Sequence, residues 1–146
     1  MVAGLFLFAF SLLVHARPVT KSVDAIANDL GALIVLNGGI FRETLNSPPI
    51  RRTQIFVHPD QVFVQDSDER RLLEIPLTKF RNLTVHPANG GKRKGAEPWQ
   101  VEINWEAEEP RTTTFLYEGH FAEHLAQVTE STLRSQWKKE LPVFHQ

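Results

Sequence analysis

The sequence predicts a mainly β domain, a small antiparallel barrel or split barrel that one C-terminal helix caps, preceded by an N-terminal apolar segment. Three observations favour this class. An uncharged run occupies residues 2–14, a strand-rich middle follows, and the apolar residues change from a period of two to helical spacing after Gly119. With 146 residues, 42% of them hydrophobic, the chain has an ordinary globular composition and is long enough for one domain.

The overall charge and the cysteine count exclude several classes of function. A formal net charge of -1 gives no general attraction for nucleic acid or anionic lipid, so an anionic partner requires a local basic patch. The absence of cysteine excludes disulfides, thiol chemistry and cysteine-bearing zinc sites. The sequence has no G-x-S-x-G, P-loop or G-x-G-x-x-G motif. We therefore expect neither a cofactor nor a nucleic-acid partner.

Residues 1–17 are expected to form a membrane anchor or a signal segment. The 13 apolar positions at 2–14 are fewer than the roughly 20 that a helix needs to cross a bilayer, and they suffice for a signal-peptide core. The following Arg17 and Lys21 favour a single-pass anchor with a cytoplasmic domain, because basic residues prefer that side. Residues 14–16 suit signal cleavage, which gives the alternative of a secreted or periplasmic protein. A buried soluble helix is a third interpretation.

Residues 18–31 are predicted to form a short connector helix. Its apolar positions are Val23, Ile26, Ala27 and Leu30, three and four residues apart, and Gly31 is a plausible stop. The β domain then extends over 32–141, and residues 142–146 are a tail.

The middle of the chain reads as a series of strands separated by turns. Residues 32–36 and 40–45 are expected to form a hairpin around the turn Asn37-Gly38-Gly39. A second hairpin is expected around Pro59, and Pro76 indicates an edge strand or a bulge. The other expected strands are 55–57, 62–64, 72–77, 80–85, 99–105 and 112–117.

The clearest strand is 99–105, where large apolar residues alternate with polar ones. A period of two places one set of side chains on one face of a sheet. We therefore predict that Trp99, Val101, Ile103 and Trp105 face the core.

A helix is predicted from His120 to Lys139, since this segment contains no Gly or Pro and Pro142 prevents its continuation. Phe121 lies on its apolar side. We expect the helix to pack onto the open end of the sheet through Leu125, Val128, Leu133 and Trp137.

Residues 32–139 resemble the pleckstrin-homology-like superfold, and in particular bacterial PH and GRAM-like domains. The resemblance lies in the strand pair IFVHPDQVFVQD, the strand RRLLEIPLTKF and the terminal helix that contains SQW. It implies a barrel plugged by that helix and a non-enzymatic binding role. In such domains, basic residues around the first hairpin bind lipid headgroups, and Arg42, Arg51 and Arg52 lie near such a place.

A second group of basic residues lies on the glycine-rich segment 90–95, which contains Lys92, Arg93 and Lys94. Near an anionic membrane surface each such residue contributes about 1 kcal/mol. Three of them would bias the orientation of a tethered domain. The alternative is an ordinary solvated loop. Together with Arg51 and Arg52, these three are the candidate ligand-binding residues.

One string matches a metal site. His120, Glu123 and His124 form H-x-x-E-H on the predicted helix, and histidines four residues apart in a helix share a face that can bind zinc. The alternative is that both histidines lie on the outer face of the capping helix.

The function expected from these observations is that of a non-enzymatic, membrane-associated interaction module that binds a protein or a lipid headgroup. The first alternative is a small zinc-dependent hydrolase that uses the H-x-x-E-H string. The second is an exported β domain that binds a protein.

Overall fold

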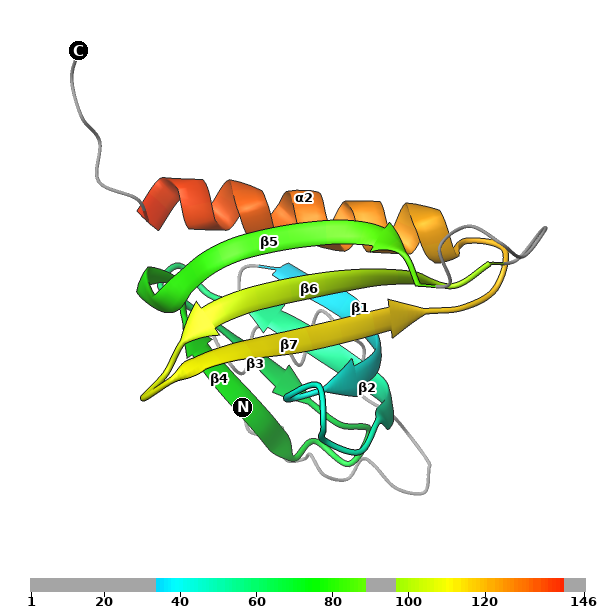
Figure 1. The fold of residues 1–146 in the computed structure, drawn as a ribbon, viewed down its shortest axis with the longest axis horizontal. Helices are drawn as coiled ribbons and strands as arrows, with labels where there is room; N and C mark the ends of the chain where they lie inside the picture. Colours follow the sequence, from blue (N-terminus) through cyan, green and yellow to red (C-terminus); the bar gives the residue numbers. More distant parts are fainter. Residues whose placement is uncertain (1–33, 89–96, 141–146) are drawn as a thin grey trace, which may run out of the picture.

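A computed structural model describes residues 34–88 and 97–140 (Figure 1). Seven strands form one antiparallel sheet and an α-helix follows them, which confirms the mainly β fold with a C-terminal helix. The expected segments 1–17, 18–31 and 142–146 lie outside the described residues. The elements are β1 (Ile34–Arg42), β2 (Ile50–Val57), β3 (Gln61–Gln65), β4 (Arg71–Pro76), the 3-10 turn η1 (Leu77–Lys79), β5 (Phe80–Pro87), β6 (Trp99–Glu106), β7 (Pro110–Tyr117) and α2 (Ala122–Glu140).

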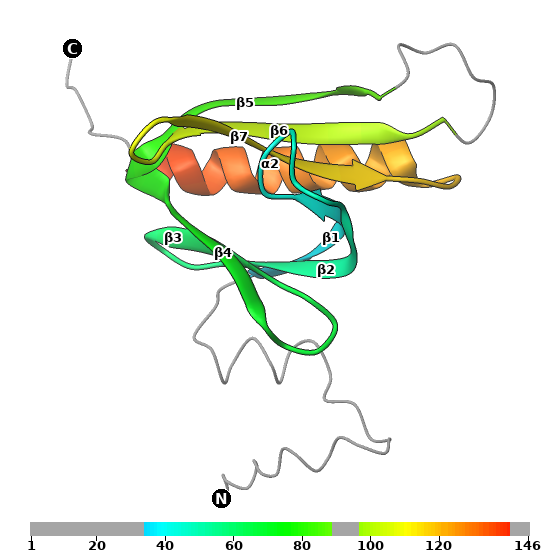
Figure 2. The ribbon, with the colours of Figure 1, turned by 60° about the horizontal axis from the view of Figure 1, so that its bottom comes forward.

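The strand order is β4-β3-β2-β1-β7-β6-β5. Although β4 and β5 are consecutive in the chain, they occupy the two ends of this order, and η1 connects them. The sheet bends into two layers, one of β1 to β4 and one of β5 to β7 (Figure 2). The paired strands are consecutive in the sequence with one exception, the pair formed by β1 and β7. β1 therefore has β2 on one side and β7 on the other. The two end strands of the sheet, β4 and β5, are therefore not paired with each other.

The predicted hairpin around Asn37-Gly38-Gly39 is wrong, because residues 34–42 form one continuous strand. The chain bends here instead of reversing, with two register shifts against β2. Gly39 has φ of 58°, and its N–H donates to the side-chain oxygen of Asn37 at 2.7 Å. Asn-Gly favours a turn locally, but tertiary pairing turns it into a bulge that carries β1 from one layer to the other.

The other strand predictions are confirmed in position, with longer ends in most cases. β2 and β3 form the hairpin expected around Pro59, closed by a hydrogen bond from the N–H of His58 to the carbonyl of Gln61 at 2.8 Å. Pro76 lies in the edge strand β4, where a missing N–H is tolerated. Residues 99–105 also behave as predicted: Val101, Ile103 and Trp105 are buried in the core, and Trp99 packs against it.

The face that α2 buries differs from the prediction. The helix begins at Ala122 rather than His120; Phe121 is 71% exposed and Val128 38% exposed. Leu133 is buried, and Leu125 and Trp137 pack against the core as expected. The remaining buried positions hold small or polar residues, which a search for large apolar side chains overlooks. They are Ala122, Ala126, Thr129 and Gln136.

The helix lies against the β5–β7 layer, on the side that faces the β1–β4 layer (Figure 2). At the free edge of β5, Arg134 Nη2 donates to the carbonyl of Leu83 at 2.6 Å. At the β2–β3 turn, Gln136 Nε2 donates to the carbonyl of Pro59 at 3.3 Å. These bonds satisfy backbone groups on both layers, so α2 closes the fold by hydrogen bonding as well as by burial.

Tyr117 joins three elements inside the domain. Its hydroxyl donates to the carbonyl of Asn37 in β1 and, having no second proton, accepts from the hydroxyl of Thr129 in α2 at 2.8 Å. Burial raises the pKa of Tyr117, so the neutral donor is the form present at neutral pH. This side chain therefore fixes α2 to β1, the strand that pairs with β2 in one layer and with β7 in the other.

We expect Tyr117→Phe to lower the free energy of unfolding by about 1 to 3 kcal/mol, because it leaves the Asn37 carbonyl and the Thr129 hydroxyl without their partner. Denaturant unfolding of Tyr117→Phe, Thr129→Val and the double variant measures the coupling. Since the two residues share one hydrogen bond, the double variant should cost less than the sum of the singles. Additive costs would contradict this arrangement.

Candidate functional site

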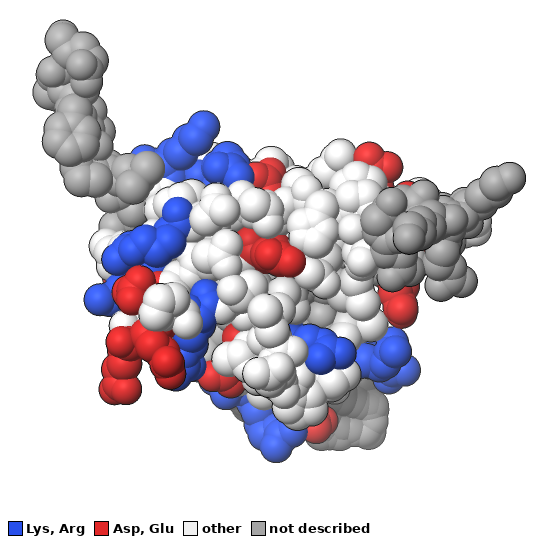
Figure 3. Space-filling model, viewed as in Figure 1, with Lys and Arg blue, Asp and Glu red and all other residues white. Residues whose placement is uncertain are grey.

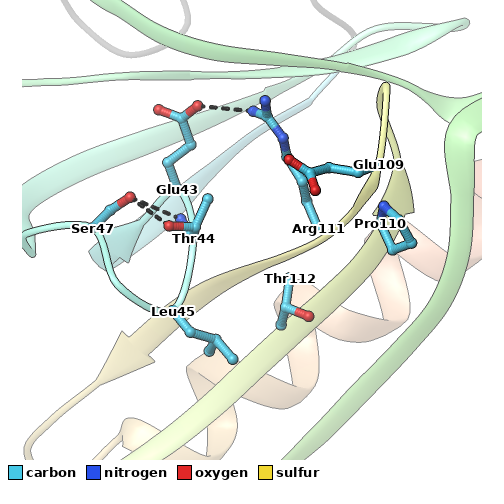
Figure 4. A pocket seen from close by; sticks show the side chains of 8 residues that line it. All are labelled: Glu43, Thr44, Leu45, Ser47, Glu109, Pro110, Arg111 and Thr112. Carbon is cyan, nitrogen blue, oxygen red and sulfur yellow. Dashed lines mark hydrogen bonds and ion pairs between the residues drawn. The ribbon is translucent and has the colours of Figure 1, made fainter.

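A cleft of about 460 Å³ lies between the β1–β2 loop and the β6–β7 turn. Figure 4 shows the residues of the loop facing those of the turn and of the start of β7 across it. The two segments are more than 60 residues apart in sequence, and the fold brings them together because β1 pairs with β7. The lining residues are Glu43, Thr44, Leu45, Ser47, Glu109, Pro110, Arg111 and Thr112.

Two linked hydrogen bonds hold the base of this cleft. β1 ends at Arg42, and the carbonyl of the next residue, Glu43, accepts from the hydroxyl of Thr113 at 2.8 Å. That hydroxyl oxygen accepts in turn from the indole N–H of Trp105 at 2.9 Å. Because Trp105 and Thr113 are both buried, the start of the loop is fixed to the core.

The charged groups of the cleft are already partly paired. The Arg111 guanidinium donates to the Glu43 carboxylate at 3.3 Å (Figure 4). It also lies 5.6 Å from the centroid of the Trp105 ring. Glu109 is the other charged residue in the lining. An incoming anion would meet two carboxylates and one guanidinium with a partner, so the cleft does not favour an anionic ligand.

Leu45 is the large aliphatic side chain in the lining of the cleft and is 60% exposed. The loop that carries it is held by a hydrogen bond from the N–H of Ser47 to the carbonyl of Thr44 at 3.1 Å, and by contact of the two hydroxyls at 2.8 Å. Leu45 also lines a second hollow of about 310 Å³ on the outer face of the sheet, with Ile40, Arg42, Ala88, Gln100, Thr114 and Leu116. We call the two hollows together the Leu45 surface.

A titratable pair lies beside this surface. The Nδ1 of His86 is 3.2 Å from the carbonyl of Pro87, and its Nε2 is 3.0 Å from the Glu102 carboxylate, which also accepts from Gln100 at 2.9 Å. Both acceptors lack a proton to donate, so both ring nitrogens are satisfied only when the imidazole is protonated. The carbonyl of Pro87 and then the Glu102 carboxylate raise the pKa of His86, against the opposing effect of burial.

We expect the His86–Glu102 pair to stabilise the fold in a pH-dependent way. Because the folded pKa of His86 is raised, its contribution is fully present below the unfolded value of about 6.5 and is lost as the pH rises through the folded pKa. NMR titration of the imidazole should place the midpoint above 6.5, and Glu102→Gln should lower it. An unchanged midpoint in Glu102→Gln would exclude the carboxylate as a cause.

The predicted ligand-binding arginines lie elsewhere. Arg51 is paired with Glu118 at 3.5 Å, with both side chains more than half exposed, and Arg52 is exposed with φ of 60°. Neither residue lines the Leu45 surface, whereas Arg42 does and donates to the carbonyl of Ser47 at 3.3 Å. Lys92, Arg93 and Lys94 lie outside the described residues.

The H-x-x-E-H residues do not have the helical geometry that the zinc hypothesis needs. His120 precedes the first residue of α2, so it does not share a helical face with His124. His120, Glu123 and His124 are all exposed. Among residues 34–88 and 97–140, no group of three or more His, Cys, Asp or Glu side chains is placed to hold a metal ion.

The face of the domain shown in Figure 3 carries acidic and basic side chains that are interspersed, with an uncharged area between them. This distribution agrees with the near-zero net charge. It gives the face no single sign with which to attract a polyanion.

Comparison of the chain with protein-family models and with curated protein sequences finds no match. In the part of the chain that the structure describes, no helix has the length and apolar character needed to span a membrane.

Sequence reasoning missed the Leu45 surface because residues 40–45 were expected to be a strand. One signal was present: Leu45 is a single large apolar residue immediately before the turn-forming run Asn46-Ser47-Pro48-Pro49. A leucine in a turn has few neighbours to bury it, and an exposed leucine in a fixed loop is a candidate contact residue.

Proposed function

We propose that this protein is a PH-like, non-enzymatic interaction module that its N-terminal apolar segment attaches to a membrane with the domain on the cytoplasmic side. The antiparallel seven-strand order and the single C-terminal helix support the PH-like part. The 13-residue apolar run at 2–14 supports the tether. The ligand-binding element is the Leu45 surface.

The observation that carries the proposal is an exposed leucine held between two hollows by a loop that is itself bonded to the core. A fixed apolar side chain with polar groups around it is the usual composition of a protein contact site, with an apolar centre and a polar rim. Because the loop is ordered before binding, its immobilisation does not oppose association.

The ligand that fits this surface is a protein segment. Its apolar side chain would contact Leu45, and its polar groups would meet lining charges of both signs, Arg42 and Arg111 against Glu43 and Glu109. A lipid headgroup is less suited, since its phosphate would approach the two carboxylates. Of the arginines expected to bind headgroups, Arg51 is paired with Glu118 and Arg52 is exposed, and neither lines this surface.

The tether is tested by membrane fractionation of the full chain and of a variant that lacks residues 2–14. We expect the full chain to pellet with membranes and the shortened chain to be soluble, because this run is the stretch of the sequence able to enter hydrocarbon. Flotation of the shortened chain with phosphatidylserine-containing vesicles would show instead that the domain itself binds lipid.

The binding surface is tested with Leu45→Asp and the control Thr78→Asp, which places the same charge at another exposed position. Proteins co-purifying with the full chain are compared by quantitative mass spectrometry. We expect Leu45→Asp to lose at least one partner about tenfold, since apolar contact of one side chain contributes about 1.5 kcal/mol or more, while Thr78→Asp retains it. Identical partner profiles for the two variants would contradict the proposal.

A further inference from the structure

The two end strands of the sheet, β4 and β5, differ in how readily they could accept a further strand. β4 has a register shift against β3 and ends in Pro76. Arg71 and Glu74 form an ion pair along it at 2.7 Å. A bulge, charged side chains and a proline are the usual features that keep an edge strand from pairing further. β4 is therefore a protected edge.

The second half of β5 lacks these features. Residues 83–87 include no Lys, Arg, Asp or Glu. They pair with β6 in a regular register, since the one shift between these strands lies between Phe80 and Asn82. In the part of the chain that the structure describes, β6 is the only strand beside β5, and Figure 2 shows β5 at the free end of its layer. This half of β5 is the candidate open edge.

Two hydrogen bonds show which main-chain groups of β5 point away from β6. The N–H of Ala88 donates to the carbonyl of Pro98 at 2.8 Å, which continues the register of the two strands. Bonded and non-bonded residues alternate in an antiparallel pair, so the even-numbered residues of this half bond to β6 and the odd-numbered ones face away. The bond from Arg134 of α2 to the carbonyl of Leu83 agrees with that alternation.

Three residues thus turn their main-chain groups to the open side: Leu83, Val85 and Pro87. Arg134 donates to the Leu83 carbonyl at 2.6 Å, and the Nδ1 of His86 lies 3.2 Å from the Pro87 carbonyl. Among the described residues, no hydrogen bond reaches the N–H of Leu83 or either main-chain group of Val85. A strand binds another strand through groups of this kind.

We propose that this side of β5 binds an extended segment of a partner protein, which adds to the sheet as an antiparallel strand beside residues 83–87. One residue of the segment would exchange two hydrogen bonds with Val85. The residue two positions further along would face Leu83, and because Arg134 already holds the Leu83 carbonyl, a proline fits there. The proposal goes beyond the Leu45 surface and does not depend on what that surface binds.

The position of α2 favours a single segment over a second copy of the chain. α2 packs against β5 and reaches its free edge through Arg134. Two β5 strands joined by a two-fold axis would place their helices on the same side of the combined sheet and against each other. A lone extended segment brings no helix, so it can pair with the edge without that collision.

The side of α2 next to β5 adds charge complementarity. This side is a row of residues three and four positions apart: Glu123, Gln127, Glu130, Arg134 and Lys138. α2 and β5 run in opposite directions (Figure 1), so Glu123 lies toward the end of β5 and Lys138 toward its start. An antiparallel segment therefore fits best with a basic residue near its N-terminal end and an acidic residue near its C-terminal end.

Amide hydrogen exchange of the full chain in detergent, measured by NMR, tests whether the edge is open. The N–H groups of Thr84 and His86 bond to β6 in the register above, whereas those of Leu83 and Val85 face away. We expect the second pair to exchange at least about tenfold faster than the first. Equal protection of all four would show that the edge is already covered and would overturn the proposal.

The binding probe is the synthetic peptide acetyl-TKTVTPTE-amide, whose valine is set to face Val85 and whose proline is set to face Leu83. The matched control has the same sequence with an N-methylated valine, which lacks the N–H for the Val85 carbonyl. We expect the first peptide to slow exchange at Leu83 and Val85 at least about fivefold and the second to leave it unchanged. No effect of either peptide, or the same effect of both, would overturn the proposal.

Val85→Pro tests the edge from the side of the protein. It removes an N–H that faces away from β6, and proline is tolerated at such a position of an edge strand. With the fold checked by the NMR spectrum, we expect this variant to lose the effect of the peptide on Leu83 and Leu45→Asp to keep it. Binding retained in folded Val85→Pro would overturn the proposal, as would binding lost in Leu45→Asp. If Val85→Pro does not fold, the N-methylated peptide still decides.

Discussion

Val101→Asp is expected to unfold the domain. Val101 is 0% exposed at the centre of β6, within the core cluster between the sheet and α2. Burying an unpaired carboxylate costs several kcal/mol or more, and the alternative of protonating it also carries a penalty. Because a domain of this size is stable by only about 5 to 15 kcal/mol, we expect loss of the cooperative thermal transition, measured by circular dichroism.

The matched control is Asn104→Asp in the same strand. Asn104 lies on the outer side of β6, where its side-chain oxygen accepts from the hydroxyl of Thr112 at 2.7 Å. An aspartate there keeps the acceptor and remains hydrated, so a change of less than about 1 kcal/mol is expected. If both variants unfold the domain, the assignment of the two faces of β6 is wrong.

Gly39→Ala is expected to cost about 2 to 5 kcal/mol of the free energy of unfolding. Gly39 has φ of 58°, a region in which a side chain costs about 1 to 2 kcal/mol. A Cβ at this position would also collide with the carbonyl oxygen of Leu116 and lie 3.1 Å from Cδ1 of Tyr117. Relieving such a contact means moving the β1–β7 pairing, which adds about 1 to 3 kcal/mol. Denaturant unfolding measures the loss.

Gly119→Ala separates the two causes. Gly119 also has a positive φ, of 94°, but a Cβ there meets nothing within 4 Å. We expect it to show the backbone cost alone and to be clearly milder than Gly39→Ala. Equal costs would mean that β1 does not approach β7 as closely as described.

The parts of the fold that the sequence predicted well are those fixed by local pattern. The alternation at 99–105 and the hairpin around Pro59 depend on neighbouring residues, and both appear as expected. The bend of β1 was missed because it depends on β7, about 75 residues further along the chain. The helix face was misjudged because close packing against a sheet selects Ala126 and Thr129, which hydrophobicity alone does not reveal.

The candidate site was beyond prediction for the same reason. Glu43 and Arg111 meet across the cleft only because β1 and β7 are adjacent, and no spacing in the sequence reports that adjacency. Arg51 was chosen from a resemblance in strand order, and His120 from the spacing of a local motif. Exposure and pairing, which decide whether such residues bind a ligand, are properties of the folded chain.

The measurement that tests the central claim most directly is photo-cross-linking from the Leu45 surface in cells that naturally express the chain. A benzophenone amino acid replaces Leu45 in one full-length variant and the exposed Thr78 in another. We expect irradiation to join a defined protein partner to position 45 and not to position 78. An absence of protein adducts at position 45, or the same adducts at both positions, would contradict the assignment of the Leu45 surface as the binding site.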